Sequence, residues 1–310
     1  MEKNDSYCIA GYALAATSAV TFSIKGIFAK ILYSYGLDPV TLLALRFMIA
    51  MPLFWAALMY FPSERVSLRD FITLVLSGVI GFYAAALADF YGLLYIDASI
   101  ERIILYTYPA LVVVLTAVFF KERLGKRKII SIALTYAGLA LALNVFSGGL
   151  RADMTGAALI LLSALVYSVS YLITEVLSAR VSGVKISAYS TTAAAFAFIG
   201  TWRFSYVPRE PLVWAYLVLI ASISTFVPVL TLALGIKRIG ASRAAVVSLI
   251  GPVSTAILAY LILGERLNIM QGAGMCLVIG GVLIISMAKG SSLKSDGRGL
   301  KDGQGGGIAQ

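Results

Sequence analysis

The stretch GLLYIDASIERIILYTYPALVVVLTAVFFKERL at residues 92–124 recurs in weaker form as GIKRIGASRAAVVSLIGPVSTAILAYLILGERL at residues 235–267. Apolar residues match by chance in any hydrophobic chain, so the polar and special residues carry the comparison. In one register the two stretches share a Gly, an Ala-Ser pair, a Pro and a Glu-Arg-Leu triplet. The sequence therefore predicts two copies of one unit, at residues 8–146 and 154–288.

The composition places both copies in a membrane. Of 310 residues, 60% are hydrophobic and 13% are charged, and the mean hydropathy is +0.92. A helix needs about 20 mostly apolar residues to cross the hydrocarbon core, and the apolar runs here lack the polar face of a soluble helix. We expect an all-α integral membrane protein with ten transmembrane helices, at residues 9–31, 39–61, 70–93, 98–120, 128–146, 154–178, 186–202, 211–236, 243–263 and 270–288.

Five spans per copy is an odd number, so the second copy has to enter the membrane from the opposite side. The loop charges agree: residues 121–128 read KERLGKRK, whereas the equivalent residues 265–271 read ERLNIMQ. With both termini in the cytoplasm, most Lys and Arg residues fall on the inner side, as the positive-inside rule requires. We predict two inverted five-helix repeats, which are typical of secondary transporters. The Gly-, Ser- and Lys-rich residues 289–310 are expected to form a disordered tail.

Several function classes are excluded by what the sequence lacks. It contains no His, and its two Cys residues, Cys8 and Cys276, lie at opposite ends of the chain. A catalytic triad, a zinc site and a redox pair are therefore not expected, and no Walker A motif is present to drive an ATPase. The sequence predicts no enzyme, cofactor, metal, ATPase subunit or nucleic-acid partner.

The paired motifs, together with Leu45-Arg46-Phe47, resemble the EamA-type exporters of the drug/metabolite transporter superfamily. The resemblance implies ten helices in two inverted repeats and efflux of a small metabolite, such as an amino acid or a cationic toxic compound. Residues 92–102 are similar to a branch of bacterial amino-acid exporters. A bacterial or archaeal cytoplasmic (inner) membrane is the implied location.

Charged side chains inside a membrane are costly and usually mark a pathway or a pair. Lys25, Arg46, Asp89 and Glu101 all fall at about the same depth in the first repeat, which predicts a network at the outer mouth of a cavity. Alternatives stay open for each. Lys25 snorkels to the headgroups or joins the network. Arg46 forms a permanent or gating pair with Asp89, or anchors a substrate carboxylate. Asp89 is a candidate proton site, and Glu101 is otherwise a helix-end residue.

Two tyrosines and two prolines complete the candidate site. Tyr83 and Tyr108 lie near mid-membrane, where a phenol needs a polar partner or a wet cavity. Pro109 and Pro252 occupy equivalent places near the bilayer centre and are expected to kink their helices, either as hinges or as static bends.

These observations predict a secondary transporter that exports small metabolites by alternating access. Amino acids are the first expected substrates and organic cations the second, with protons as a possible coupling ion. A nucleotide-sugar or phosphorylated-metabolite antiporter is the first alternative, but it would need deep Lys or Arg residues in the second half, and none is found there. A membrane scaffold or an intramembrane enzyme is the alternative from another class.

Overall fold

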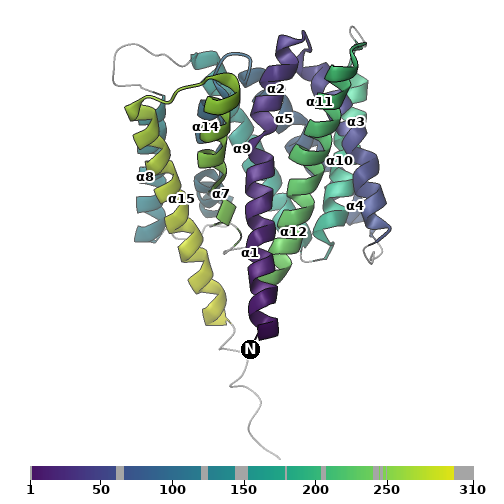
Figure 1. Ribbon diagram of the computed structural model, residues 1–310. Helices are drawn as coiled ribbons and strands as arrows, with labels where there is room; N and C mark the ends of the chain where they lie inside the picture. The colour runs from purple at the N-terminus through teal and green to yellow at the C-terminus, as the bar shows by residue number, and fades with distance from the viewer. Residues whose placement is uncertain are drawn as a thin grey trace, which may run out of the picture.

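The computed structural model describes residues 2–60, 66–119, 125–143, 153–178, 180–203, 207–239, 244, 247–248 and 250–296. These residues form a bundle of upright helices and include no β-strand (Figure 1). Several helices are long and apolar enough to cross a membrane, and others are apolar but shorter. The all-α membrane fold expected from the sequence is thereby confirmed.

Consecutive helical segments group into five spans in each repeat. The first repeat contains α1 (Glu2–Ser23) with α2 (Lys25–Ser34), α3 (Pro39–Leu58), α4 (Leu68–Ser77) with η1 (Gly78–Ala84) and α5 (Ala85–Gly92), α6 (Ala98–Leu105) with α7 (Tyr108–Phe119), and α8 (Lys126–Ala142). The second contains α9 (Met154–Ser178), α10 (Gly183–Thr201), α11 (Pro211–Ala221) with η3 (Ser222–Phe226) and α12 (Val227–Ile239), α14 (Ile250–Leu263), and α15 (Ile269–Asp296).

Four of these spans are interrupted within the bundle. The first span breaks at Ile24, between α1 and α2, and the fourth breaks between α6 and α7. The third span of each repeat contains a π-helical segment, η1 or η3, at an equivalent place. Wide turns of this kind are rare and frequently mark functional sites. The matched pair therefore indicates that both repeats inherit one local distortion from their common unit.

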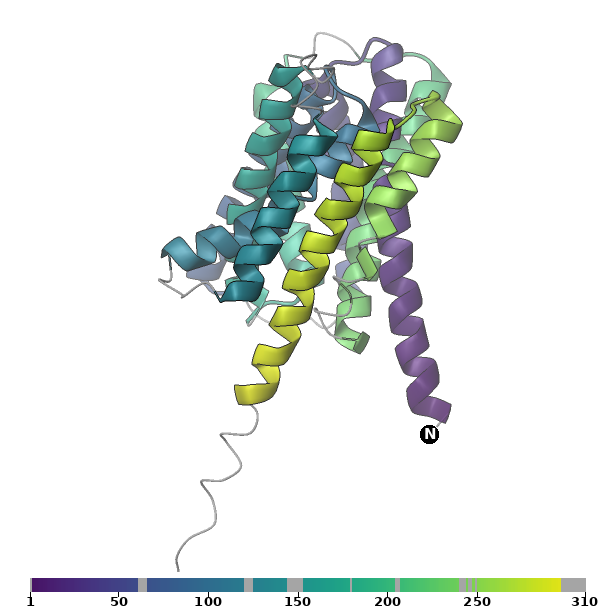
Figure 2. The same cartoon turned by 90° about the vertical axis from the view of Figure 1, so that its left-hand side faces the viewer.

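The packing has a pseudo-two-fold pattern. Equivalent spans pack against each other, as α8 does against α15 and α3 against α10. The remaining contacts occur in exchanged pairs, so that α1 packs on α12 and α5 packs on α9. Figure 2 shows α8 and α15 running side by side along one face of the bundle. This exchange of partners is what two related halves produce when they associate about a two-fold axis.

Both ends of the helical bundle lie on the same side. α1 begins and α15 ends at the lower edge of Figure 1, whereas the α14–α15 connection lies at the upper edge. The upper edge is called the distal side below. α15 continues to Asp296, so the beginning of the segment expected to be a disordered tail is helical, and residues 297–310 lie outside the described part of the chain.

Candidate functional site

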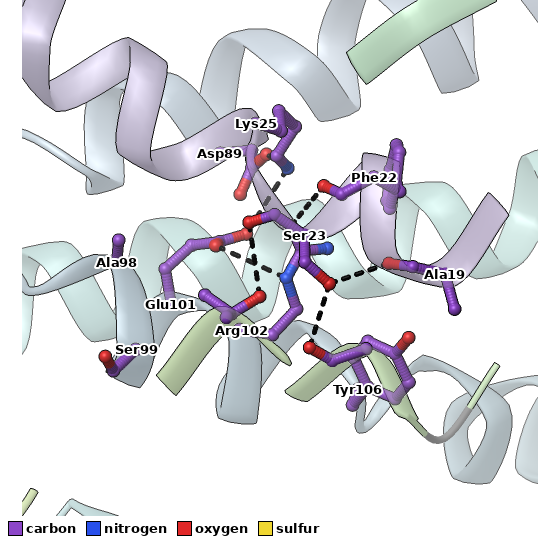
Figure 3. Close-up of polar contacts among 12 residues, drawn as sticks. Ala19, Phe22, Ser23, Lys25, Asp89, Ala98, Ser99, Glu101, Arg102 and Tyr106 are labelled. Carbon is purple, nitrogen blue, oxygen red and sulfur yellow. Dashed lines mark hydrogen bonds and ion pairs between the residues drawn. The ribbon is translucent and has the colours of Figure 1, made fainter. Parts of the chain in front are cut away.

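Five charged side chains are buried among the helices of the first repeat. Lys25, Arg46, Asp89, Glu101 and Arg102 are each at most 4% exposed. They come from α2, α3, α5 and α6, and we call them the charged cluster. Figure 3 shows four of them, Lys25, Asp89, Glu101 and Arg102, converging. The structure therefore brings together all four charged residues that the sequence singles out and adds a fifth, Arg102.

Lys25 is the centre of the ion pairing. It is the first residue of α2, directly after the break at Ile24, so the interrupted helix turns this side chain inward. Its Nζ donates a short hydrogen bond to Asp89 Oδ2 and a second, of 3.3 Å, to Glu101 Oε1. One ammonium thus bridges two carboxylates from different helices. The snorkelling alternative for Lys25 is wrong, because the side chain points into the protein and not to the headgroups.

Arg102 completes the cluster from the neighbouring position on α6. Its Nε lies 4.0 Å from Glu101 Oε2, and its Nη2 donates a 2.9 Å hydrogen bond to the backbone carbonyl of Phe22. The Phe22 ring also contacts Lys25 Nζ and the Arg102 guanidinium, at 5.4 Å and 5.0 Å from its centroid. Cations over an aromatic face are stabilised by the ring quadrupole, which offsets part of the cost of burying them.

The cluster is not internally satisfied. Among the described residues, Asp89 Oδ1, Glu101 Oε2 and Arg102 Nε are buried and have no hydrogen-bond partner. Leaving a buried polar atom unpaired costs about 1–3 kcal/mol, and more when the group is charged. Two carboxylate oxygens therefore lack a donor and one guanidinium N–H lacks an acceptor.

Arg46 has a different partner from the one expected. Its Nε donates a 2.7 Å hydrogen bond to Thr225 Oγ1 in η3, and its guanidinium stacks 5.2 Å from the centroid of the Phe90 ring. The expected pair between Arg46 and Asp89 is not formed, because Asp89 faces Lys25 instead. Arg46 and Lys25 are predicted at about the same depth in the membrane, so depth does not decide which of them pairs with Asp89. The direction in which each side chain leaves its helix decides the pairing.

The two predicted tyrosines belong to separate aromatic groups. Tyr83, in η1, is half-buried and packs on Phe198 of α10 with the ring centroids 4.6 Å apart. Phe198 in turn stacks on Phe47, the neighbour of Arg46, at 5.4 Å. Tyr83 is thus connected to the charged cluster through two phenylalanine rings.

Tyr108 is the centre of a second group. Its ring centroid lies 5.1 Å from that of Tyr167 and 6.0 Å from that of Tyr171, both on α9. Tyr167 and Tyr171 share one face of α9 with the buried residues Ile160 and Ala164, yet they are 36% and 38% exposed. Both tyrosines therefore stay accessible on the face of α9 that also carries buried residues.

The two prolines lie in different surroundings. Pro109 is the second residue of α7, directly after the break between α6 and α7, so the fourth span is interrupted where a proline is expected to disturb its helix. Pro252 is the third residue of α14, and the described residues Ala244, Val247 and Ser248 before it are also helical. A kink at Pro252 stays a prediction.

A contact between the repeats closes the distal side. The Glu265 carboxylate accepts hydrogen bonds from the backbone N–H groups of Ala98 and Ser99, at 2.9 and 3.0 Å, and from Ser99 Oγ at 2.8 Å. It thereby caps α6, where a negative charge is favourable. Asp97 holds the N-cap position itself, but its side chain makes no capping bond. Burial and the Glu265 carboxylate raise the pKa of Asp97, while Lys30 lowers it.

Three of these participants, Arg102, Glu265 and Thr225, were not anticipated as site residues. Arg102 follows Glu101 and reads as a second helix-end residue, although a deep position for an arginine is itself a signal. Glu265 belongs to the repeated Glu-Arg-Leu triplet. The triplet indicates that the two halves are related, but it does not indicate a role for Glu265. Thr225 carries no signal that sequence reasoning could use. Among the described residues, no group of three or more acidic or Cys side chains is arranged to hold a metal.

The comparisons with known proteins agree with this architecture. Residues 9–144 and 154–287 each match the model of the EamA-like transporter family. An uncharacterized transporter of Bacillus subtilis (strain 168), YcbK, is 33% identical over 288 residues, covering 89% of this chain and 91% of the relative. An uncharacterized transporter of Archaeoglobus fulgidus is 25% identical over 272 residues, covering 86% of this chain and 96% of the relative. A crystal structure of a protein with 18% sequence identity shares the fold, with a TM-score of 0.63 over 93% of this chain and 99% of that one.

Proposed function

Because the chain belongs to the EamA-like transporter family, we propose that it is a secondary transporter that exports small metabolites by alternating access. Amino acids are the first substrates proposed, and organic cations are the second. The proposed location is a bacterial or archaeal cytoplasmic membrane with both termini in the cytoplasm. The excess of Lys and Arg in the loops on the side of the termini supports this orientation.

One observation carries the choice of amino acids. The charged cluster contains both signs of charge, and its unpaired atoms are two carboxylate oxygens and one guanidinium N–H. An amino-acid zwitterion offers the complementary groups, since its ammonium donates hydrogen bonds and its carboxylate accepts them. A purely cationic substrate would satisfy only Asp89 and Glu101. The mixed pattern therefore favours the zwitterion.

The position of the cluster supports a transport role over a structural one. Lys25 follows a helix break, and Glu101 and Arg102 lie within two turns of another. Interrupted helices near the membrane centre are a recurring feature of substrate sites in secondary transporters. The Glu265 carboxylate joins the two repeats on the distal side, and Tyr167 and Tyr171 stay accessible on α9. These contacts are what we expect of a state closed on the distal side.

Coupling to protons is proposed to pass through Asp89. Its carboxylate is buried, faces Lys25 and keeps one oxygen without a partner. A substrate ammonium entering the site would displace Lys25 from Asp89. A proton on Asp89 would remove the negative charge that holds this ammonium, so protonation and binding of the ammonium would exclude each other. No described residue outside the cluster combines burial, charge and an unpaired atom in this way.

Counterflow into proteoliposomes tests the proposal. Vesicles preloaded with unlabelled amino acids should accumulate the labelled form, and Glu101→Gln should reduce this accumulation. Glu210→Gln, which changes an exposed acidic residue at the start of α11, is the matched control. Absence of counterflow for every amino acid, with organic cations transported instead, would refute the amino-acid assignment. Unchanged dependence on a pH gradient in folded Asp89→Asn would remove Asp89 from the coupling.

A further inference from the structure

The charged cluster has an excess of positive charge. Lys25, Arg46 and Arg102 supply three cations, whereas Asp89 and Glu101 supply at most two negative charges. Each of the five side chains is almost completely buried, so bulk water compensates little of the difference. A buried uncompensated charge is costly, and proteins normally pair it or give it a ligand. The cluster therefore lacks at least one negative charge.

The unpaired cation is Arg46. Lys25 contacts both carboxylates of the cluster, and Arg102 lies within ion-pair distance of Glu101. Within the described residues, Arg46 makes a single hydrogen bond, from Nε to the uncharged Thr225, and no carboxylate lies within 4.0 Å of its nitrogens. Its other contacts are the faces of two phenylalanine rings.

The geometry of Arg46 leaves one edge of the guanidinium open. Thr225 occupies Nε and is itself held by a hydrogen bond to the carbonyl of Ile220, so the orientation is fixed from the second repeat. Among the described residues, neither Nη atom of Arg46 makes a hydrogen bond. Two parallel N–H groups at this edge match the two oxygens of a carboxylate.

Arg46 is also close enough to the rest of the cluster to share one small ligand with it. The Arg46 guanidinium and Lys25 Nζ both contact the Phe90 ring, at 5.2 Å and 5.6 Å from its centroid. Lys25 in turn contacts Asp89. The Asp89 carboxylate is therefore linked to the Phe90 ring through one residue, Lys25.

We propose that Arg46 is the residue that binds the carboxylate of the transported molecule, through both Nη atoms, and that this carboxylate supplies the missing negative charge. The inference rests on the proposed function and narrows it to substrates that carry a carboxylate. Thr225 is the positioning residue, since it holds Nε and leaves both Nη atoms for the ligand. Because Thr225 belongs to η3, carboxylate binding involves groups from both repeats.

Acetate is the probe for this site, since it is the smallest stable carboxylate without an ammonium group. Purified protein in detergent is unfolded thermally while acetate replaces chloride at constant ionic strength, and acetamide serves as the uncharged isostere. We expect acetate to raise the melting temperature of the wild type and acetamide to leave it unchanged, because ligands that bind the folded state stabilise it. Arg46→Gln should abolish the effect, whereas Arg209→Gln, at an exposed position, should retain it.

A second variant covers the case in which Arg46→Gln does not fold. Arg46→Lys keeps the charge but loses the two-pronged edge, and its apparent affinity for acetate should be about tenfold weaker. An acetate effect that is equal in wild type and Arg46→Lys would overturn the proposal. So would the absence of any effect in the wild type, including the case in which chloride occupies the site as well as acetate does.

The outcome is separable from that of the transport assay. Acetate stabilisation that depends on Arg46, together with failed amino-acid counterflow, would refute the proposed substrates and leave the carboxylate site in place. Amino-acid counterflow that persists at the wild-type apparent affinity in folded Arg46→Lys would refute the carboxylate site and leave the transport function in place.

Discussion

Replacing Glu265 tests how the two repeats are held together on the distal side. Its carboxylate accepts three hydrogen bonds from the first turn of α6, two from backbone N–H groups and one from Ser99 Oγ. Glu265→Gln keeps one amide oxygen as an acceptor and loses the charge, and Glu265→Ala removes every contact. Both changes leave the sequence of α6 intact.

The size of the effect follows from these contacts. Loss of an N-cap interaction costs about 1 kcal/mol, and hydrogen bonds to a charged group contribute about 1.5–3 kcal/mol when buried. Glu265 is only half-buried, so we expect about 1 kcal/mol for Glu265→Gln and about 2 kcal/mol for Glu265→Ala. This corresponds to roughly a 5- to 30-fold shift toward states open on the distal side. Asp97 already holds the N-cap position, so its carboxylate can take over part of the capping, and the double variant Asp97→Ala/Glu265→Ala should shift further.

Pulsed electron spin resonance can measure this shift. Spin labels at Leu94 and Asn268, both exposed on the distal side, report the distance across the cap in a background with Cys8 and Cys276 replaced by Ser. The Glu265→Gln distance distribution should gain weight at longer distances. A distribution identical to that of the wild type would refute the reasoning. So would an equal change in Glu210→Gln, because Glu210 begins α11 without making a capping bond.

Three further outcomes are expected from denaturation of the purified protein. Lys25→Met should lower the free energy of unfolding by about 3–5 kcal/mol, because it strands two buried carboxylates, and adding Asp89→Leu should recover part of the loss; no recovery would argue against the pairing. The pKa of Asp97 is raised in the folded protein, so the free energy of unfolding falls as the pH rises from the usual aspartate pKa through the raised pKa of the folded state. Asp97→Asn should flatten this part of the stability–pH curve and be more stable than the wild type at pH values above it. Gly138→Ala should destabilise by about 1–3 kcal/mol, because the new Cβ would lie 2.7 Å from a backbone oxygen of α15, whereas Gly280→Ala meets nothing within 4 Å and should be neutral or slightly stabilising.

The spans and the repeat could be predicted because both depend on chemistry that is local in sequence. An apolar run of sufficient length can only be buried or cross a membrane, and the shared Pro and Glu-Arg-Leu positions survive in a background of interchangeable aliphatic residues. The break at Ile24 and the two π-helical segments were not predicted, whereas the interruption between α6 and α7 lies where Pro109 is expected to kink its helix. Ile24 and its neighbours include neither Pro nor a Gly before the break, and the π-helical segments η1 and η3 have no sequence signal of their own.

The sequence predicts which charged residues gather in the candidate site, but it does not predict which of them form ion pairs. Hydropathy gives the depth of a charged residue, and this was sufficient to group Lys25, Arg46, Asp89 and Glu101. Pairing depends on the direction of each side chain around its helix, which the break before Lys25 changes. From depth alone, an Arg46–Asp89 pair is as suitable as the Lys25–Asp89 pair that is formed. The sequence does not single out Arg102, because a position at the end of a helix also explains its charge.

The packing contact between α8 and α15, called the seam below, has a consequence for how a chain with two fused repeats arises. Gly138 and Gly274 bring the two backbones into direct contact, and Ser131 Oγ donates a hydrogen bond to the carbonyl of Gly281. Here the fifth helix of each half meets its own counterpart, as two identical subunits would meet at a dimer axis. Fusion into one polypeptide mainly raises the effective concentration of one half near the other. The halves, synthesised as separate polypeptides and inserted in opposite orientations, should therefore find each other along this seam and reconstitute the carrier.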